Sequence, residues 1–434
     1  MTAEATAIGH APRVVRTTFL CGLVLVLEGY DLTVVGYVVP HLVEAWSKPP
    51  AAFAAALTAS NVGMFIGALL CGWFGDRYGR KPVLLGCLAV FGTASLLTSF
   101  VATTSHLTVA RLVTGIGLGG GIPVCIALVS DISPRRLQGS LVIAMVTGVV
   151  VGNLGAGIVA AQMLSSFGWP SVFVVGGFAP LLLLPLVAIS LPETHAVKAA
   201  SAARATSPAP TAAAVNRLTG LFARGLAAPT ILLWAINFLN LLTVFFVNAW
   251  LPLMLRSMGA STEIAIWTAS MFYVGAIVAA VLSGTLVVRY GIERVVAAML
   301  AFGGSCIMVV AAVTMPIGSV GALILGFGFG TGGSQLGISA LAGALYPAEV
   351  RATGAGWATG VGRLGNVAGA AMGGILFSLG WAPRQMLLAL SAVPLANAAL
   401  LIALERARYL WATTSVSGVG SACAETPANP AVSS

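Results

Sequence analysis

Charged residues are scarce in this chain of 434 residues, because Asp, Glu, Lys and Arg together make up only 8% of it. Soluble domains carry about 25% charged residues. Hydrophobic residues make up 58% of the chain, and its mean hydropathy is +1.00. A water-exposed surface cannot be built from this composition. The sequence therefore excludes a soluble protein and predicts a membrane protein that crosses the bilayer many times.

Cysteine is also sparse, with six residues scattered mostly inside apolar runs and without the spacing of metal ligands. This distribution argues against a zinc site and against a disulfide framework. The sequence likewise shows no cofactor motif and no set of nucleophile and base. We therefore expect no metal, no cofactor and no enzymatic activity.

Basic residues outnumber acidic ones, which gives a formal net charge of +9. They stand in short clusters between apolar runs and do not form a patch with interleaved aromatic residues. Topology signals of membrane proteins are distributed in this way. Nucleic acid is therefore not an expected partner, and the lipid bilayer is.

Long apolar runs are what the chain has in abundance, and a membrane-spanning helix needs about 20 such residues. The first run is too long for the apolar region of a cleavable signal peptide, which has about 7–15 residues. Cutting at turn and charge clusters predicts twelve helical spans. We place them at 17–40, 53–74, 82–102, 106–130, 139–164, 169–191, 228–255, 263–287, 294–314, 318–344, 353–380 and 383–404.

The basic residues outside these spans fall almost entirely on one side, and only Lys48, Arg256 and Arg384 fall on the other. The positive-inside rule then places both termini in the cytoplasm. An Ala-, Pro-, Ser- and Thr-rich stretch divides the spans into two groups of six. The predicted units are a six-helix bundle at 1–192, a cytoplasmic linker at 193–227, a second six-helix bundle at 228–410 and a disordered tail at 411–434.

The two groups of spans echo each other at a separation of about 212 residues. The sequence "RYG" at 77–79 recurs at 289–291, and Gly152-Asn153 recurs as Gly365-Asn366. The glycine-rich "GIGLGGG" similarly recurs as "GFGFGTG". A parallel duplication explains these echoes. Transporters built from such repeats place their binding site between the halves, near the bilayer midplane.

Two carboxylates, Glu28 and Asp31, lie within the first predicted span. Their i, i+3 spacing places them on one helix face, about 5–6 Å apart at Cβ. An Asp at the centre of a membrane helix costs about 2.5–3.5 kcal/mol, so both should face the protein interior and titrate as a coupled pair. We predict proton coupling, with Asp31 as the leading carrier and Glu28 as its partner. The alternative is that both are structural hydrogen-bonding groups.

Two arginines also fall within spans. Arg363 lies about ten residues into its span, hence about 15 Å deep at 1.5 Å per residue. Its planar guanidinium suits a substrate carboxylate, or it pairs with Asp31. Arg111 lies nearer the outer end of the fourth span, where proton coupling and a packing or pairing role are both open.

The stretch "GWFGDRYGRK" follows the second span. It resembles the signature of the major facilitator superfamily, G-x-x-x-D-R-x-G-R-[RK]. This resemblance implies the major facilitator fold, with 12 transmembrane helices in two six-helix bundles, and a motif that acts as a conformational gate. It also places Arg111 at a position that is often linked to proton coupling. The matching residues are Gly72, Asp76, Arg77, Gly79, Arg80 and Lys81.

Three separated stretches look like the aromatic acid:proton symporter family: "EGYDLTVVGYVVP" in the first span, "NFLNLLTVFFVNAWLP" at 237–252 and "YPAEVRATGAGWATGVGRLGN" at 346–366. Glu28 stands where many members have Asp, which leaves the substrate branch open. The resemblance implies a monomeric symporter of the bacterial inner membrane that imports a small aromatic carboxylate of the benzoate, hydroxybenzoate or arylpropionate type together with protons. It also places Gln335 in the cavity.

Further candidates for substrate binding come from residue type alone. Asn240 is a partner for an aromatic hydroxyl, and Phe245 and Trp357 offer rings for stacking, although aromatic residues in spans more often serve packing. Arg363 and Asp31 complete the expected binding set. Two other functions remain open, a proton-driven exporter of drugs or metabolites and an aromatic-acid sensor, but Arg363 favours an anionic substrate over a cationic drug.

Overall fold

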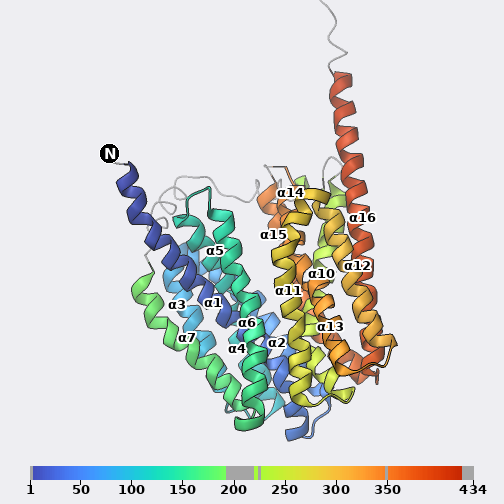
Figure 1. The fold of residues 1–434 in the computed structure, drawn as a ribbon. Coiled ribbons are helices and arrows are strands. Elements are labelled where there is room, and N and C mark those ends of the chain that lie inside the picture. The colour runs from blue at the N-terminus through green and yellow to red at the C-terminus, as the bar shows by residue number, and fades with distance from the viewer. Residues whose placement is uncertain (1–2, 192–218, 223–225, 348–349, 423–434) are drawn as a thin grey trace, which may run out of the picture.

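The computed structural model describes residues 3–191, 219–222, 226–347 and 350–422, and nearly all of them are helical. Figure 1 shows two groups of long helices standing side by side. The first bundle contains α1 (Ala3–Ala45), η1 (Pro50–Phe53), α2 (Ala54–Tyr78), α3 (Arg80–Thr98), α4 (Thr104–Leu118), α5 (Gly121–Ile132), α6 (Gln138–Phe167) and α7 (Pro170–Ser190). The second contains α10 (Ala227–Ser257), α11 (Thr262–Tyr290), α12 (Ile292–Ala312), α13 (Ile317–Phe327), η2 (Gly328–Gly332), α14 (Gly333–Leu345), α15 (Arg351–Ser378) and α16 (Pro383–Ala422).

Eleven helical segments of the described chain are long and apolar enough to cross a membrane. The twelfth predicted span corresponds to α15, which has 28 residues and packs along α10. Glycine, threonine and Arg363 interrupt its apolar run, so the mean hydropathy of α15 is lower than that of the eleven other spans. The fold is thus the predicted all-helical arrangement of twelve spans.

The predicted fourth and tenth spans, at 106–130 and 318–344, each correspond to one 29-residue helical segment, Thr104–Ile132 and Ile317–Leu345, and the regular α-helix is interrupted within each. The fourth span consists of α4 and α5 with a turn at Gly119-Gly120, and the tenth consists of α13, η2 and α14. Both interruptions fall in the glycine-rich stretches that recur between the two halves, "GIGLGGG" and "GFGFGTG". Glycine disfavours a regular helix by about 1 kcal/mol relative to alanine, and it lets neighbouring backbones approach.

The two halves that the sequence predicts as a duplication share local geometry. Gly79 and Gly291 end α2 and α11 with φ of 99° and 87°, a left-handed conformation that side-chain-bearing residues avoid. Gly152 of α6 lies against the backbone of Val26 on α1, and Gly365 of α15 lies in the same way against Phe238 on α10. The two halves therefore share their helix packing as well as their turns.

The described helices do not test the predictions for the linker and the tail. Most of the linker at 193–227 lies outside the described residues. Helix α16 continues to Ala422, past the predicted end of the second bundle at residue 410, and the rest of the expected tail also lies outside the described part. The disordered tail and the linker stay predictions.

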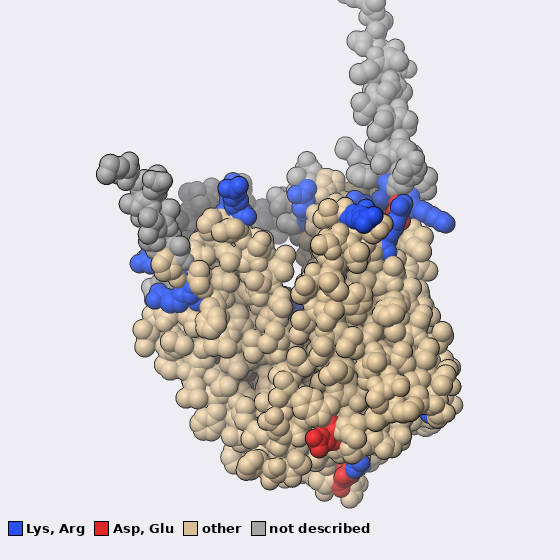
Figure 2. Space-filling view, viewed as in Figure 1, with Lys and Arg blue, Asp and Glu red and all other residues tan. Residues whose placement is uncertain are grey.

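The two bundles separate toward one end of the molecule. We call this the basic end, because Figure 2 shows most of the visible Lys and Arg gathered there, and the opposite one the far end. The same view shows a cleft between the bundles that opens at the basic end and closes below it. Any substrate bound between the bundles in this conformation has access to the basic end.

The far end is closed by contacts between the bundles. Glu44 on α1 pairs with Arg256 on α10 at 2.8 Å, and the hydroxyls of Tyr37 on α1 and Ser270 on α11 lie 3.0 Å apart. Gly374 of α15 packs against Ala54 at the start of α2. These contacts hold helices of opposite bundles together from the middle of the molecule to the far end.

Candidate functional site

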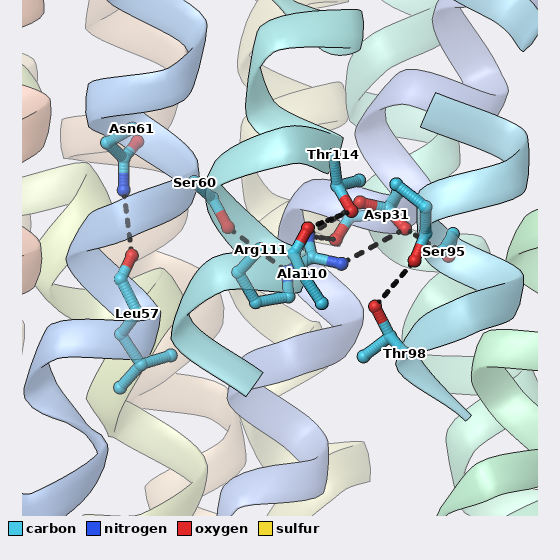
Figure 3. Close-up of polar contacts among 10 residues, drawn as sticks. Asp31, Leu57, Ser60, Asn61, Ser95, Thr98, Ala110, Arg111 and Thr114 are labelled. Atoms are coloured by element: carbon cyan, nitrogen blue, oxygen red, sulfur yellow. Dashed lines mark hydrogen bonds and ion pairs between the residues drawn. The ribbon is translucent and has the colours of Figure 1, made fainter. Parts of the chain in front are cut away.

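Asp31 forms a closed ion pair within the first bundle. Its Oδ2 lies 2.6 Å from Nη2 of Arg111 on α4, and neither side chain is exposed. Ser95 on α3 donates to Asp31 Oδ1 at 2.7 Å, and Arg111 Nε donates to Ser60 on α2 at 3.1 Å. Figure 3 shows this group, with Asp31, Ser95 and Arg111 drawn together. Four helices of one bundle are thus joined around one carboxylate.

This geometry separates Asp31 from both Arg363 and Glu28. Arg363, the alternative partner we considered for Asp31, lies elsewhere, and Arg111 takes that position. Glu28 and Asp31 also do not share partners, because their i, i+3 positions differ by about 60° around the helix and Asp31 turns toward Arg111. The sequence did not identify Ser60 or Ser95, since single serines in apolar helices carry no distinctive pattern.

Breaking the Asp31–Arg111 pair should destabilise the protein. Asp31→Asn leaves the Arg111 charge buried without its counterion, which costs about 3–5 kcal/mol in comparable cases. We expect thermal unfolding of the purified protein to shift clearly downward. The double variant Asp31→Leu with Arg111→Met removes both charges and should recover most of the loss. Equal losses in the single and double variants would contradict this interpretation.

Glu28 is 1% exposed, and neither of its carboxyl oxygens has a hydrogen-bond partner within the described residues. The carboxyl group lies against Gly121, the first residue of α5, and a Cβ at that position would occupy the place of Oε2. The glycine at the break between α4 and α5 therefore makes room for Glu28. Its charge is attracted by Arg363 of the second bundle.

Arg363 lies on α15 at the level where α2 and α15 meet. Its Nη1 donates to the backbone carbonyl of Met64 on α2 at 3.4 Å, the one hydrogen bond that it makes within the described part of the chain. A guanidinium has five N–H donors, so most of its hydrogen-bonding capacity is free. Glu28 and Arg363 thus belong to opposite bundles, whereas Asp31 and Arg111 belong to one.

Gln335 and Asn240 come together in the second bundle. Asn240 on α10 donates to Gln335 Oε1 at 2.7 Å, and Gln335 Nε2 donates to Asn237 at 3.1 Å. Ser334 donates to the other end of the Asn240 side chain at 3.2 Å. Asn240 is 1% exposed and Gln335 is only partly buried. Gln335 is therefore the member of this network that a ligand can reach, and Asn240 holds it in place.

The two aromatic candidates differ in their surroundings. Phe245 is partly exposed along α10. Trp357 stacks on Trp234 with ring centroids 5.7 Å apart and an interplanar angle of 22°. One face of the Trp357 ring thus packs the contact between α10 and α15, but 46% of this side chain is exposed, so both rings remain candidates for contact with a substrate ring.

The stretch 72–81 forms the turn between α2 and α3 at the basic end. Arg80 pairs with Asp131 near the end of α5 and donates to the carbonyl of Ala127 at 2.7 Å. The Arg77 guanidinium stands over the rings of Trp73 and Tyr78, at 5.6 and 5.8 Å from their centroids. The side chain of Asp76 lies outside the described residues. Asp131 was missed, although its acidic position at the end of an apolar span was a usable signal.

Known proteins resemble this chain along nearly its whole length. Residues 21–370 and 233–433 match the family model described as Major Facilitator Superfamily. A gallate transporter of Pseudomonas putida is 35% identical, covering 92% of this chain and 93% of its own. The 4-hydroxybenzoate transporter PcaK of the same organism is 33% identical, covering 86% and 89%.

Among solved structures, a D-xylose-proton symporter has the same fold, with a TM-score of 0.71 at 18% identity, covering 88% of this chain and 96% of its own. The helices, the repeat and the signature turn agree with these matches. This protein is a multi-pass membrane transporter and belongs to the major facilitator superfamily.

Proposed function

We propose that the protein imports a small aromatic carboxylate together with protons across a bacterial inner membrane, as a monomer and by alternating access. The resemblance to transporters of gallate and 4-hydroxybenzoate supports the substrate class. The gathering of basic residues at one end supports a cytoplasmic location for that end, with both termini there. In this reading the structure represents the state that is open to the cytoplasm.

The observation that carries the proposal is the state of Arg363. It lies between the bundles with most of its donors free and with a buried carboxyl group, Glu28, as its electrostatic partner. A carboxylate fits the guanidinium fork through two parallel hydrogen bonds. We assign the substrate carboxylate to Arg363, with Gln335 and Phe245 around the rest of the molecule.

Competition for Arg363 couples the anion to the proton. When the substrate carboxylate binds Arg363, Glu28 loses its countercharge and lies buried without a hydrogen-bond donor. A buried unpaired carboxylate is costly, and a proton removes that cost. Glu28 therefore takes up a proton as the anion binds. When the anion and the proton leave, the Glu28 carboxylate again has Arg363 as its countercharge. One proton per monoanion makes this cycle electroneutral.

Asp31 and Arg111 act next to this exchange. Their pair joins α1 to α4, and α5 begins with the glycine against which Glu28 lies. We infer that the Asp31–Arg111 pair positions Glu28 and responds to the protonation of Glu28. We therefore assign the role of leading proton carrier to Glu28 instead of Asp31. The turn at 72–81 is the proposed cytoplasmic gate, since Arg80 connects the start of α3 to the end of α5.

Uptake by proteoliposomes with an imposed pH gradient tests the function. The substrates are benzoate, the hydroxybenzoates, arylpropionates and a neutral sugar. We expect saturable uptake of aromatic acids that rises when the outside is acidified and collapses with a protonophore. Saturable sugar uptake without acid uptake would overturn the proposal, and acid transport only in the outward direction would indicate an exporter.

A further inference from the structure

Helices α1 and α6 of the first bundle pack as α10 and α15 do in the second. Gly152 lies against the backbone of Val26 and Tyr30, and Gly365 lies against the backbone of Phe238 and Leu242. Positions on the first pair therefore correspond to positions on the second, about 212 residues later in the sequence. This correspondence allows the polar groups at the two helix contacts to be compared one by one.

In the first bundle the asparagine that follows this glycine has a hydroxyl partner. The Thr33 hydroxyl on α1 lies 2.9 Å from the carboxamide of Asn153, and the hydroxyl of Tyr273 on α11 lies 3.5 Å from Thr33. The Asn153 carboxamide is thus satisfied by the protein itself.

The second bundle has the same asparagine but lacks the hydroxyl. Asn366 corresponds to Asn153, and the position of Thr33 is taken by Phe245. A phenylalanine cannot donate a hydrogen bond, and the buried Asn366 Oδ1 has no partner among the described residues. Leaving a buried acceptor unpaired is costly. The duplication has therefore replaced a hydroxyl by a ring at this contact and left an acceptor open.

A second open acceptor stands on α2. Asn61 is 8% exposed, its Nδ2 donates to its own helix at Leu57, 3.2 Å away, and its Oδ1 is buried without a partner in the part of the chain that the structure describes. Figure 3 shows Asn61 apart from the group around Arg111, with its amide turned to Leu57. The free carboxamide oxygen thus belongs to a side chain that takes no part in the hydrogen bonds around Asp31 and Arg111.

The two asparagines lie at the same level of opposite bundles. Helices α2 and α15 are antiparallel and in contact at Ala54 with Gly374 and at Met64 with Arg363. Asn61 precedes Met64 by three residues and Asn366 follows Arg363 by three, so each lies about 4.5 Å nearer the far end. That separation from Arg363 is on the scale of an aromatic ring.

We propose that Asn61 and Asn366 accept hydrogen bonds from a ring hydroxyl of the substrate, while Phe245 lies against the ring and Arg363 holds the carboxylate. This inference rests on the proposed function and narrows its substrate class to ring-hydroxylated aromatic acids. The substrate hydroxyl takes the place that the Thr33 hydroxyl has beside Asn153 in the first bundle. An unsubstituted benzoate leaves both oxygens unpaired, and sites built for a hydroxyl reject analogues that lack it.

The test compares KM for 4-hydroxybenzoate, 3-hydroxybenzoate and benzoate in proteoliposomes. For the wild type we expect KM to be at least about tenfold lower for one hydroxybenzoate than for benzoate. Asn61→Leu and Asn366→Leu should each raise the hydroxybenzoate KM toward the benzoate value, so that the ratio of the two KM values falls toward one. Saturable benzoate uptake by the same vesicles shows that the variant is folded.

Asn397→Leu is the matched control. Asn397 is fully buried, donates to the carbonyl of Ile236 at 3.0 Å and has an Oδ1 with no partner among the described residues, but it lies between α16 and α10 inside the second bundle. It should leave the KM ratio unchanged. A ratio preserved in both leucine variants, an equal loss for all three acids, or the same effect from Asn397→Leu would overturn the assignment. Absence of any aromatic-acid uptake by the wild type would instead refute the proposed function, and this inference with it.

Discussion

Replacing Arg363 with alanine is expected to raise the KM for aromatic carboxylates by about 10- to 150-fold, because hydrogen bonds to charged groups contribute about 1.5–3 kcal/mol. The structure gives the reason, since among the described residues the guanidinium makes one long hydrogen bond, to Met64, and its other donors have no partner there. Radiolabelled uptake over a range of substrate concentrations measures the change.

Two further variants sharpen this prediction. Arg363→Lys keeps the charge but loses the planar fork, so it should fall between the wild type and alanine. Arg384→Ala removes a positive charge at the far-end start of α16 and should leave KM unchanged. An unaltered KM in Arg363→Ala would rule out a role for this residue in anion binding.

Replacing Glu28 with glutamine is expected to abolish accumulation driven by a pH gradient while substrate exchange continues. Glutamine fills nearly the same space against Gly121 but cannot bind and release a proton. With one proton per monoanion, the wild type should concentrate substrate about tenfold per pH unit. The Glu28→Gln variant should stop at about equal concentrations inside and outside.

The measurement pairs two assays on the same proteoliposomes: accumulation under an acid-outside gradient, and counterflow of labelled against unlabelled substrate without a gradient. Gly121→Ala provides an independent approach, because its Cβ displaces the Glu28 carboxyl group without changing its chemistry. It should impair accumulation as well. Concentrative uptake by the Glu28→Gln variant would assign the proton to another group, with Asp31 as the first to test.

Glu28 and Asp31 lie three residues apart in the sequence, but their surroundings in the structure differ. The coupling role proposed for Glu28 depends on that difference. Asp31 is enclosed by Arg111 and Ser95. Within the described residues Glu28 has no hydrogen-bond partner, and its carboxyl group lies against Gly121. Helical spacing showed that both acids turn inward, yet their partners lie on other helices, far away in the sequence.

The fourth and tenth spans show the same difference between what local sequence patterns determine and what helix packing determines. Hydropathy located the fourth and tenth spans, because burial in lipid demands apolar length. It could not show that Gly121 begins a new helix against the Glu28 carboxyl group, since that depends on the position of α5 relative to α1. Asn61 and Asn366 were likewise visible as residues of apolar helices, but their shared level became apparent only from the contact between α2 and α15.

By itself, the sequence determined that this protein crosses a membrane through twelve spans, that its halves are duplicated and that its basic residues lie at one end. Composition, hydropathy and local turns carry that information, because each depends on residues close together in the chain. Only the tertiary structure decided that Arg111 holds Asp31, that Glu28 lies against Gly121 and that the Asn61 and Asn366 oxygens have no partner among the described residues. Those relations depend on how helices from distant parts of the chain pack, and a linear pattern does not specify that packing.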